Sequence, residues 1–242
     1  MKKEQKLIYC NTKYANTCRM TPFNVIVYTI NHSVDGVLLD ELYIKAQRLA
    51  RNVWTGSANN STIKRDPHLV LSHCLAGVLS EYFWKLYINE HGKFVTETEF
   101  TDASIQIDLQ TIDKGRKIEV RSSFPFKGIE FAICNGNKPF KIIGPYHNQY
   151  KPVEIDKEYY LSCLFPLKDP KDLIKIVKCD CDFSFALSGG ATWHMMWDNY
   201  SSRVAKLTPE DRSYEVETDY RVVPFQFALD SVQMRSIITG NI

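Results

Sequence analysis

The sequence predicts a mixed fold of the α/β (α+β) class, and three observations lead to this prediction. Residues 104–124 read as two alternating strands joined by a turn at Lys114-Gly115, which is the pattern of an antiparallel hairpin. A long apolar segment with helical spacing, from Pro67 to about Asn89, precedes this hairpin. Short apolar runs separated by turn residues follow it, so further strands are expected towards the C-terminus.

The N-terminal part is expected to form one strand and two helices. Residues 23–30 have strand composition, and residues 35–54 carry apolar side chains at helical spacing. Asp66-Pro67 supplies the second helix with an acidic N-cap and a proline in its first turn. Because that helix is apolar almost all the way round, we expect it to be buried. A polar loop at residues 56–65 separates the two helices.

Strands are expected through most of the remaining chain. Their apolar runs lie at residues 93–100, 104–112, 117–124, 128–134, 140–143, 159–165, 173–177, 182–187 and 222–228. Gly189-Gly190 is expected to break the chain after the strand at 182–187. No helical pattern is evident before the strand at 159–165, where Gly144-Pro145 and Lys151-Pro152 indicate loops.

The hairpin carries charged side chains on one face. With a two-residue turn at its tip, Asp108 lies across from Arg121, and Gln110 lies across from Glu119. Asp108 and Glu119 are then diagonal neighbours about 7–8 Å apart at the backbone. Two carboxylates and a cation on one sheet face suit a site for Mg²⁺ and phosphate. The alternative is a plain hairpin with a surface Asp–Arg pair.

This arrangement of residues resembles the PD-(D/E)XK nuclease superfamily, which has the restriction-endonuclease-like fold. Asp108 matches the acid on the first strand of the hairpin, and Glu119 matches the acid on the second. Arg121 stands where the family usually has lysine. Glu81, on the helix before the hairpin, matches the glutamate that the family often carries there. The resemblance covers residues 67–124.

The resemblance implies a nuclease-like core at residues 67–165, with a mixed central sheet flanked by helices. Residues 1–66 would add a strand and a helix packed on that core, and residues 166–242 a β-rich extension of the same domain. The family core also includes a crossover helix after the hairpin, and the sequence offers none. An insertion or a missing helix are both compatible with this departure.

The resemblance also implies a metal-dependent endonuclease that hydrolyses phosphodiester bonds in DNA, of the restriction or phage-associated type. Its Mg²⁺ or Mn²⁺ would be held by Asp108, Glu119 and the main-chain carbonyl of Val120. Glu81 would bind a second metal or orient the attacking water. Arg121 would stabilise charge on the phosphate, because a guanidinium stays protonated and is a poor general base. A homodimer is left open.

Two other classes of function are compatible with the same residues. One is a nuclease-like fold that binds nucleic acid or protein without cleaving it, which the arginine at position 121 and the low net charge favour. The other is a structural or interaction protein whose polar hairpin face is simply solvated. Glu81 is likewise open to two interpretations, as the partner of a metal ion or of Arg121, or as a side chain that faces solvent or caps a loop.

Basic residues are concentrated near the proposed site. The net charge of the whole chain is only +2, but residues 114–141 hold seven Lys or Arg and two acids. Apart from Arg121, these basic residues are expected to contact the DNA backbone. They are Lys114, Arg116, Lys117, Lys127, Lys138 and Lys141.

Length and composition are those of an ordinary globular protein, with 242 residues of which 44% are hydrophobic and 24% are charged. No apolar run is long enough to span a membrane, and the N-terminus lacks the apolar stretch of a signal peptide. Seven scattered cysteines are not typical of an extracellular disulfide scaffold. Cys179-Asp-Cys181 lacks the second pair of ligands that a zinc site needs. A cytoplasmic protein is expected.

Four aromatic residues occur within eight positions: Trp193, His194, Trp197 and Tyr200. Such a cluster can stack on unpaired bases, anchor a protein interface or belong to the core. The sequence does not distinguish between these three roles.

Overall fold

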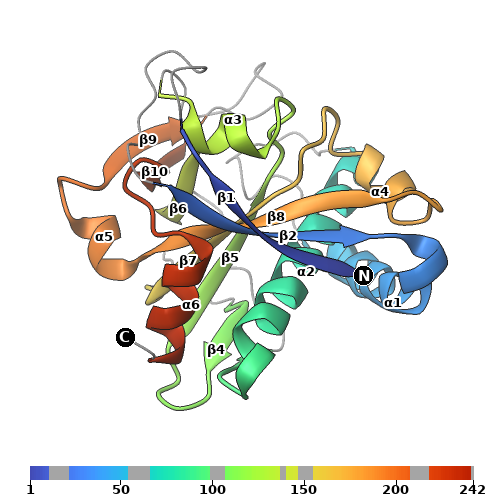
Figure 1. Ribbon diagram of the computed structural model, residues 1–242, viewed down its shortest axis with the longest axis horizontal. Coiled ribbons are helices and arrows are strands. Elements are labelled where there is room, and N and C mark those ends of the chain that lie inside the picture. Colours follow the sequence, from blue (N-terminus) through green and yellow to red (C-terminus); the bar gives the residue numbers. More distant parts are fainter. Residues whose placement is uncertain are drawn as a thin grey trace.

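The computed structural model describes residues 1–10, 22–53, 66–98, 107–136, 140–146, 155–207 and 218–240. In these ranges the chain forms three layers around a seven-stranded sheet (Figure 1). Helices cover one face of this sheet, and two short helices with a three-stranded sheet pack against the other face. The predicted mixed α/β class, with a large mixed sheet flanked by helices, is confirmed.

The main sheet has the strand order β1-β2-β8-β7-β5-β4-β3. Strands β5 and β7 are parallel, and every other neighbouring pair is antiparallel. The strands are β1 (Lys2–Ile8), β2 (Phe23–Ile30), β8 (Phe183–Thr192), β7 (Tyr159–Leu164), β5 (Lys117–Ser123), β4 (Leu109–Thr111) and β3 (Val95–Glu97). Because β8 lies between β2 and β7, residues beyond 165 contribute a central strand of this sheet.

Helices α1, α2, α4 and α6 cover one face of the main sheet and share its larger core. Their bounds are α1 (His32–Asn52), α2 (Pro67–Ile88) followed by the 3-10 turn η2 (Asn89–His91), α4 (Asp172–Ile176) and α6 (Ser231–Thr239). The predicted cap of α2 is confirmed, since the backbone N–H of His68 donates to the Asp66 carboxylate at 2.9 Å. No helix within the described ranges is long and apolar enough to cross a membrane.

The opposite face of the main sheet packs against α3 (Ile129–Cys134), α5 (Trp193–Trp197) and a second sheet. The second sheet has the order β6-β10-β9, and all its strands are antiparallel. Its bounds are β6 (Lys141–Tyr146), β10 (Thr218–Pro224) and β9 (Arg203–Leu207). The strand predicted at 140–143 therefore exists, but it belongs to a different sheet from the hairpin.

The strands predicted at residues 128–134 and 173–177 are wrong, because these segments form α3 and α4. A five- to seven-residue apolar run fits either a strand or a single buried helical turn, so periodicity cannot separate them. A turn precedes α4, where the Asp169 carboxylate accepts a hydrogen bond from Lys171 N–H at 2.9 Å. This turn favours a helix over a strand in the segment that follows. The strands predicted at 93–100 and 104–112 are seen only as the short β3 and β4, and residues 99–106 lie outside the described ranges.

The break predicted at Gly189-Gly190 is also wrong, since β8 continues through both glycines. Leu161 pairs with Gly190 and Cys163 pairs with Leu187, so β8 holds one extra residue as a bulge. Gly189 has a φ of 84°, and a Cβ there would lie 2.1 Å from the carbonyl oxygen of Leu229. The glycines therefore allow the segment that leads into α6 to approach the strand closely.

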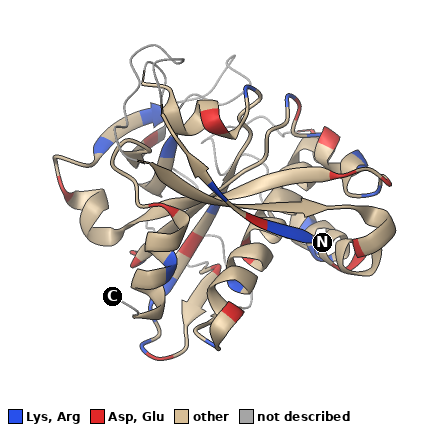
Figure 2. Ribbon diagram, in the orientation of Figure 1, with Lys and Arg blue, Asp and Glu red and all other residues tan. Residues whose placement is uncertain are grey.

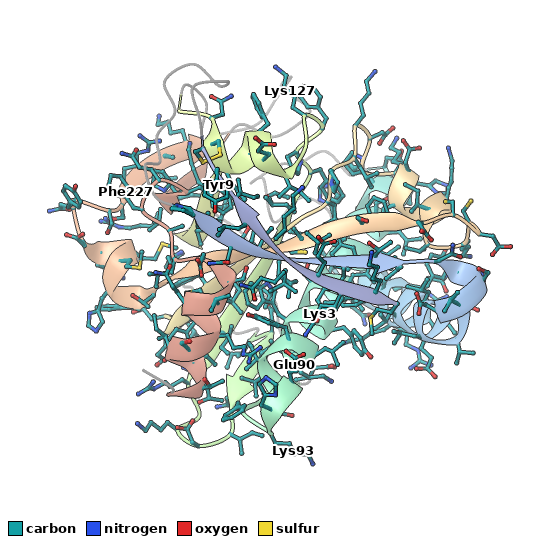
Figure 3. The ribbon with its side chains drawn as sticks, in the orientation of Figure 1. Lys3, Tyr9, Glu90, Lys93, Lys127 and Phe227 are labelled. Carbon is teal, nitrogen blue, oxygen red and sulfur yellow. A yellow bond between two sulfur atoms is a disulfide. The ribbon has the colours of Figure 1, made fainter. Side chains whose placement is uncertain are left out.

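Strand β1 and helix α6 were not predicted from the sequence. Strand β1 is an edge strand whose residues are exposed except for the last, so it has no apolar alternation to detect. Its Lys3 pairs with Glu90, which also binds Arg235 of α6 at 2.9 Å (Figure 3). Ion pairs thus attach both elements to the turn η2 that follows α2.

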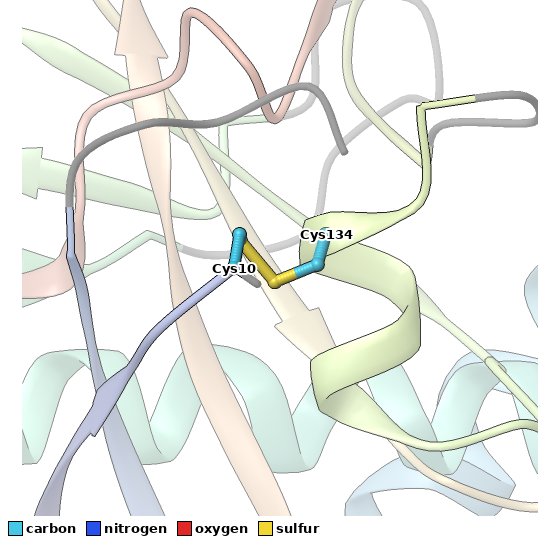
Figure 4. The surroundings of a disulfide bond; sticks show 2 residues. All are labelled: Cys10 and Cys134. Atoms are coloured by element: carbon cyan, nitrogen blue, oxygen red, sulfur yellow. A yellow bond between two sulfur atoms is a disulfide. The ribbon is translucent and has the colours of Figure 1, made fainter. Parts of the chain in front are cut away.

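A disulfide joins Cys10, just after β1, to Cys134 at the end of α3 (Figure 4). The scattered cysteines did not predict this bond. The two residues are 124 positions apart in sequence, and the fold brings their Cα atoms within 5.1 Å. The edge strand is therefore covalently attached to the layer that packs on its sheet.

Candidate active site

The hairpin between β4 and β5 has a longer turn than the sequence suggested. Thr111 N–H donates to the Arg116 carbonyl at 2.9 Å, which encloses a four-residue turn, and Gly115 has a φ of 62°. As a result, Gln110 pairs with Lys117, and the predicted pairing of Gln110 with Glu119 is wrong. The register moves by two residues, so the side chains keep their expected faces.

Strands β4 and β5 separate beyond Leu109. Their described pairing consists of Leu109 with Ile118 and Gln110 with Lys117. Where the strands part, Val120 N–H donates to Oδ2 of Asp108 at 2.7 Å. The carboxylate of Asp108 thus occupies the place that a neighbouring strand's carbonyl would fill, and this bond fixes it against β5.

Glu119, in the middle of β5, is 6% exposed and lies between two cations. Its Oε1 is 2.6 Å from Nη2 of Arg121, and its Oε2 is 2.7 Å from Nζ of Lys157. The side chain of Lys157 is 1% exposed. Lys157 is a residue of this site that sequence reasoning missed, because no motif or spacing relates it to Glu119.

The backbone holds the Lys157 segment firmly against the sheet. Glu158 N–H donates to the Lys117 carbonyl at 3.0 Å, and Lys117 N–H donates to the Glu158 carboxylate at 2.6 Å. The Glu158 carbonyl accepts from Trp193 N–H at 2.9 Å. The segment that carries Lys157 is therefore hydrogen-bonded on both sides, to β5 and to the start of α5. These bonds hold Lys157 beside Glu119.

Glu81 comes from α2, whose position on the sheet is fixed by a bond from Trp84 Nε1 to the Ser162 carbonyl of β7 at 3.1 Å. Its partner is Lys45 of α1, with Nζ 3.6 Å from Oε2. Lys45 also binds Glu97 at 2.8 Å. The observed partner of Glu81 is therefore a lysine that the sequence did not single out.

The three acids affect one another electrostatically. Burial raises the pKa of Glu81 to about 7; Lys45 opposes this shift, and Glu97 and Glu119 add to it. Burial also raises the pKa of Asp108 well above its usual range, and the charges of Glu119 and Glu81 raise it further. Glu81 of α2, Asp108 just before β4 and Glu119 of β5 are therefore near enough for their charges to disfavour one another.

The oxygen atoms of Asp108 and Glu119 are the ones that a metal ion would bind. Among the described residues, no group of three His, Cys, Asp or Glu side chains is placed to hold a metal ion. Asp108 is engaged by Val120, and both oxygens of Glu119 are engaged by cations. However, acids that raise each other's pKa are in a situation that a divalent cation relieves, and carboxylate oxygens suit Mg²⁺ and Mn²⁺. The chemistry of the donors fits such an ion, and the ion pairs of Glu119 must open to admit it.

The five predicted DNA-binding residues that the structure describes do not form one patch. Lys114, Arg116 and Lys117 lie at the hairpin end of β5. Lys127 follows the other end of β5 and stacks on Phe131 of α3, far from the hairpin end (Figure 3). Lys141 is on the second sheet, and Lys138 lies outside the described residues. Basic and acidic residues are interspersed over the molecule (Figure 2).

The aromatic cluster of α5 is only partly in the core. Met196 is fully buried and anchors the helix, whereas Trp197 is 44% and Tyr200 is 80% exposed. The guanidinium of Arg221 lies 4.4 Å from the centre of the Trp197 ring. The core role is therefore excluded for Trp197 and Tyr200, and stacking or interface roles stay open for them.

Comparisons with known proteins give little independent information. No protein-family model matches the chain, and no solved structure matches it significantly. The chain is 28% identical, over 166 residues, to an uncharacterised protein of Methanocaldococcus jannaschii. That match includes 62% of this chain and 58% of the relative, so the chain spans less than two thirds of the relative's length.

Replacing Glu81 by glutamine should flatten the pH dependence of stability. In the folded protein Glu81 ionises near pH 7 instead of 4.5, so the folded state binds the extra proton between these values. The parent should therefore lose stability as pH rises from 4.5 to 7, by roughly 3 kcal/mol at about 1.4 kcal/mol per unit. Urea denaturation across this range measures the loss. Glu41→Gln, an exposed change on α1, is the control, and an equal slope in Glu81→Gln and the parent would contradict the prediction.

Proposed function

We propose that this protein is a metal-dependent endonuclease that hydrolyses phosphodiester bonds in DNA, built on a restriction-endonuclease-like core. The observation that carries the proposal is the electrostatic interaction of Glu81, Asp108 and Glu119, which come from three separate segments. These are the acids of the motif, and burial with mutual repulsion raises the pKa of the first two. Carboxylates whose pKa is raised by burial and by neighbouring charges are typical of functional sites.

Asp108 and Glu119 would hold Mg²⁺ or Mn²⁺, with the main-chain carbonyl of Val120 as the predicted third ligand. When bound, such an ion lowers the pKa of a coordinated water and offsets charge on the phosphate. Glu81 is suited to accept a hydrogen bond from the attacking water. Arg121 is suited to bind a non-bridging phosphate oxygen, since its guanidinium already lies beside Glu119.

The polar face of the hairpin supports a nucleic acid as the substrate. Lys114 lies in the turn of the hairpin, and Arg116 and Lys117 lie where β5, the strand that carries Glu119, begins. Arg116 is held by a bond from Nη1 to the Tyr159 hydroxyl at 2.7 Å, while Lys114 is exposed. Cations at the edge of an acidic site fit a polyanion whose backbone passes across it.

A second candidate function is a nuclease-like module that binds nucleic acid without cleaving it. The ion pairs of Glu119 with Lys157 and Arg121 favour this candidate, because they neutralise the carboxylate that would otherwise hold the metal. Cleavage requires these pairs to open, whereas binding alone does not.

The experiment that tests the proposal is incubation of the purified protein with supercoiled plasmid and Mg²⁺, Mn²⁺ or EDTA. We expect nicked or linear plasmid with either metal and none with EDTA. Asp108→Asn, which keeps the size of the side chain, is the control for a contaminating nuclease. Retention of plasmid without cleavage would support the binding module, and neither binding nor cleavage by folded protein would overturn both candidates.

Removing two hairpin cations should weaken DNA binding in a salt-dependent way. The double variant Lys114→Ala/Lys117→Ala should reduce the slope of log affinity against log salt by about 1.8, at about 0.9 for each phosphate contact. Fluorescence anisotropy with a labelled duplex measures this slope. Lys127→Ala is the matched control, since Lys127 lies beyond the far end of β5. An unchanged slope in the double variant would exclude the hairpin end from the DNA contact.

A further inference from the structure

We propose that Lys157 and Arg121 form a two-cation clamp on Glu119 that transfers to a substrate phosphate, so that metal ion and phosphate bind cooperatively. This inference rests on the proposed function and concerns the order in which the same site is filled. It follows from the contacts of Glu119, from the burial of Lys157 and from the charge balance of the site.

Glu119 cannot serve as a metal ligand without a change of partners. Nη2 of Arg121 lies 2.6 Å from one oxygen and Nζ of Lys157 lies 2.7 Å from the other. A metal ion that binds either oxygen must displace a cation or share the oxygen with it, and like charges at such a distance repel strongly in a buried site. A metal ion alone therefore binds against two positive charges.

Lys157 cannot simply move into water when Glu119 is taken. Its side chain is 1% exposed, and its segment is held by the two hydrogen bonds between Lys117 and Glu158. An ammonium group that loses an anion at a buried position carries a large desolvation cost. A replacement anion at the same place removes this cost.

A phosphodiester is suited to be that replacement anion. Its two non-bridging oxygens resemble the two oxygens of a carboxylate, and the clamp already directs one nitrogen to each carboxylate oxygen. The side chain of Arg121 is partly exposed, although the Nη2 atom that contacts Glu119 is itself buried. A phosphate would therefore meet the clamp first on the side of Arg121, and the guanidinium must turn outward to bind it.

Charge balance leads to the same conclusion. In the described part of the site, four carboxylates interact with four cations: Glu81, Glu97, Asp108 and Glu119 with Lys45, Lys85, Arg121 and Lys157. A divalent ion adds two positive charges beside Arg121 and Lys157, and a phosphate adds one negative charge beside Glu119 and Asp108. Each ligand offsets part of the repulsion that the other meets, so each favours the other.

The test measures Mn²⁺ binding to the whole protein by electron paramagnetic resonance of free Mn²⁺. The probes are a phosphorothioate duplex, which is anionic and resists cleavage, and a duplex with one methylphosphonate strand, which reduces the charge. We expect Mn²⁺ to bind at least about tenfold more tightly with the phosphorothioate duplex, within the usual range of coupling between sites. The methylphosphonate duplex should give a smaller gain.

Variants separate the clamp from a general effect of charge. Lys157→Met should bind Mn²⁺ more tightly than the parent without DNA, and it should lose most of the gain on adding the phosphorothioate duplex. Lys85→Met is the matched control, because it removes a cation that binds Glu97 in the same cluster and leaves both contacts of Glu119 intact. It should keep the full gain. If Lys157→Met does not fold, Arg121→Gln replaces it, since Arg121 is only partly buried. Arg121→Gln should show the same two effects: tighter Mn²⁺ binding without DNA and a smaller gain with the phosphorothioate duplex.

Each outcome bears on a separate claim. Mn²⁺ binding that needs Asp108 but is equal with and without the phosphorothioate duplex would overturn the clamp and leave the proposed function standing. An equal loss of the gain in Lys157→Met and Lys85→Met would also overturn it, in favour of a general charge effect. No Mn²⁺ binding by the parent under either condition would overturn the proposed function itself.

Discussion

Asp108→Asn is expected to abolish DNA cleavage and at the same time to stabilise the folded protein. The amide keeps an oxygen that can accept the bond from Val120 N–H at the same position. It removes a charge that burial and the neighbouring Glu119 and Glu81 disfavour, as the raised pKa of Asp108 indicates. Loss of a metal ligand should lower the nicking rate by about 10³-fold or more, because a bound ion contributes several kcal/mol to such a reaction.

The stabilisation by Asp108→Asn should increase as pH rises. A carboxyl whose pKa is raised on folding destabilises the folded state as pH increases above the value for the unfolded chain. The parent should therefore weaken from acid towards neutral pH more steeply than the variant, which keeps only the contribution of Glu81, with a gain of about 1 kcal/mol at the upper end. Urea denaturation at several pH values measures this gain. A variant less stable than the parent at every pH would mean that Asp108 has a structural role.

Glu119→Gln is expected to have the opposite effect on stability and the same effect on cleavage. Glutamine removes the negative charge to which Lys157 and Arg121 are paired. Because Lys157 is 1% exposed, we expect a loss of about 3 kcal/mol in the free energy of unfolding, at the lower end of what breaking a buried pair costs. Cleavage should be lost to the same extent as in Asp108→Asn.

The two isosteric changes therefore form a matched pair, with equal loss of activity and opposite changes in stability. Urea denaturation and plasmid nicking on the same preparations test both. If Glu119→Gln unfolds too readily for assay, the double variant Glu119→Gln/Lys157→Met removes both charges and should recover much of the stability. If Glu119→Gln is as stable as the parent, the ion pair between Glu119 and the buried Lys157 contributes little to stability.

The positions of the acids could be predicted because they depend on local features. Asp66 caps α2 and fixes where the helix begins, which determines the face that carries Glu81. Apolar alternation in β5 identifies the side on which Glu119 and Arg121 lie. The predicted turn was two residues shorter than the observed one. A shift of two residues in the pairing still keeps every side chain on its expected face.

The partners of the acids could not be predicted, because they come from elements that are distant in sequence. Lys157 reaches Glu119 only because β7 lies parallel to β5, and the pairing of two parallel strands leaves no mark in either segment. Lys45 reaches Glu81 only through the packing of α1 on α2. The sequence therefore indicated a set of acids, and the compensating charges emerged from the tertiary structure.

The strand order has a consequence for how the molecule is made. Strands β1 and β2 form one part of the main sheet and β3, β4, β5 and β7 form another, and β8 is the strand that links the two parts. The two parts cannot join in the sheet until β8 (Phe183–Thr192) has left the ribosome. Until then β7 can pair with β5 and bring Lys157 to Glu119, but the other edge of β7 is unpaired, so the nascent chain exposes an open sheet edge that a chaperone can bind.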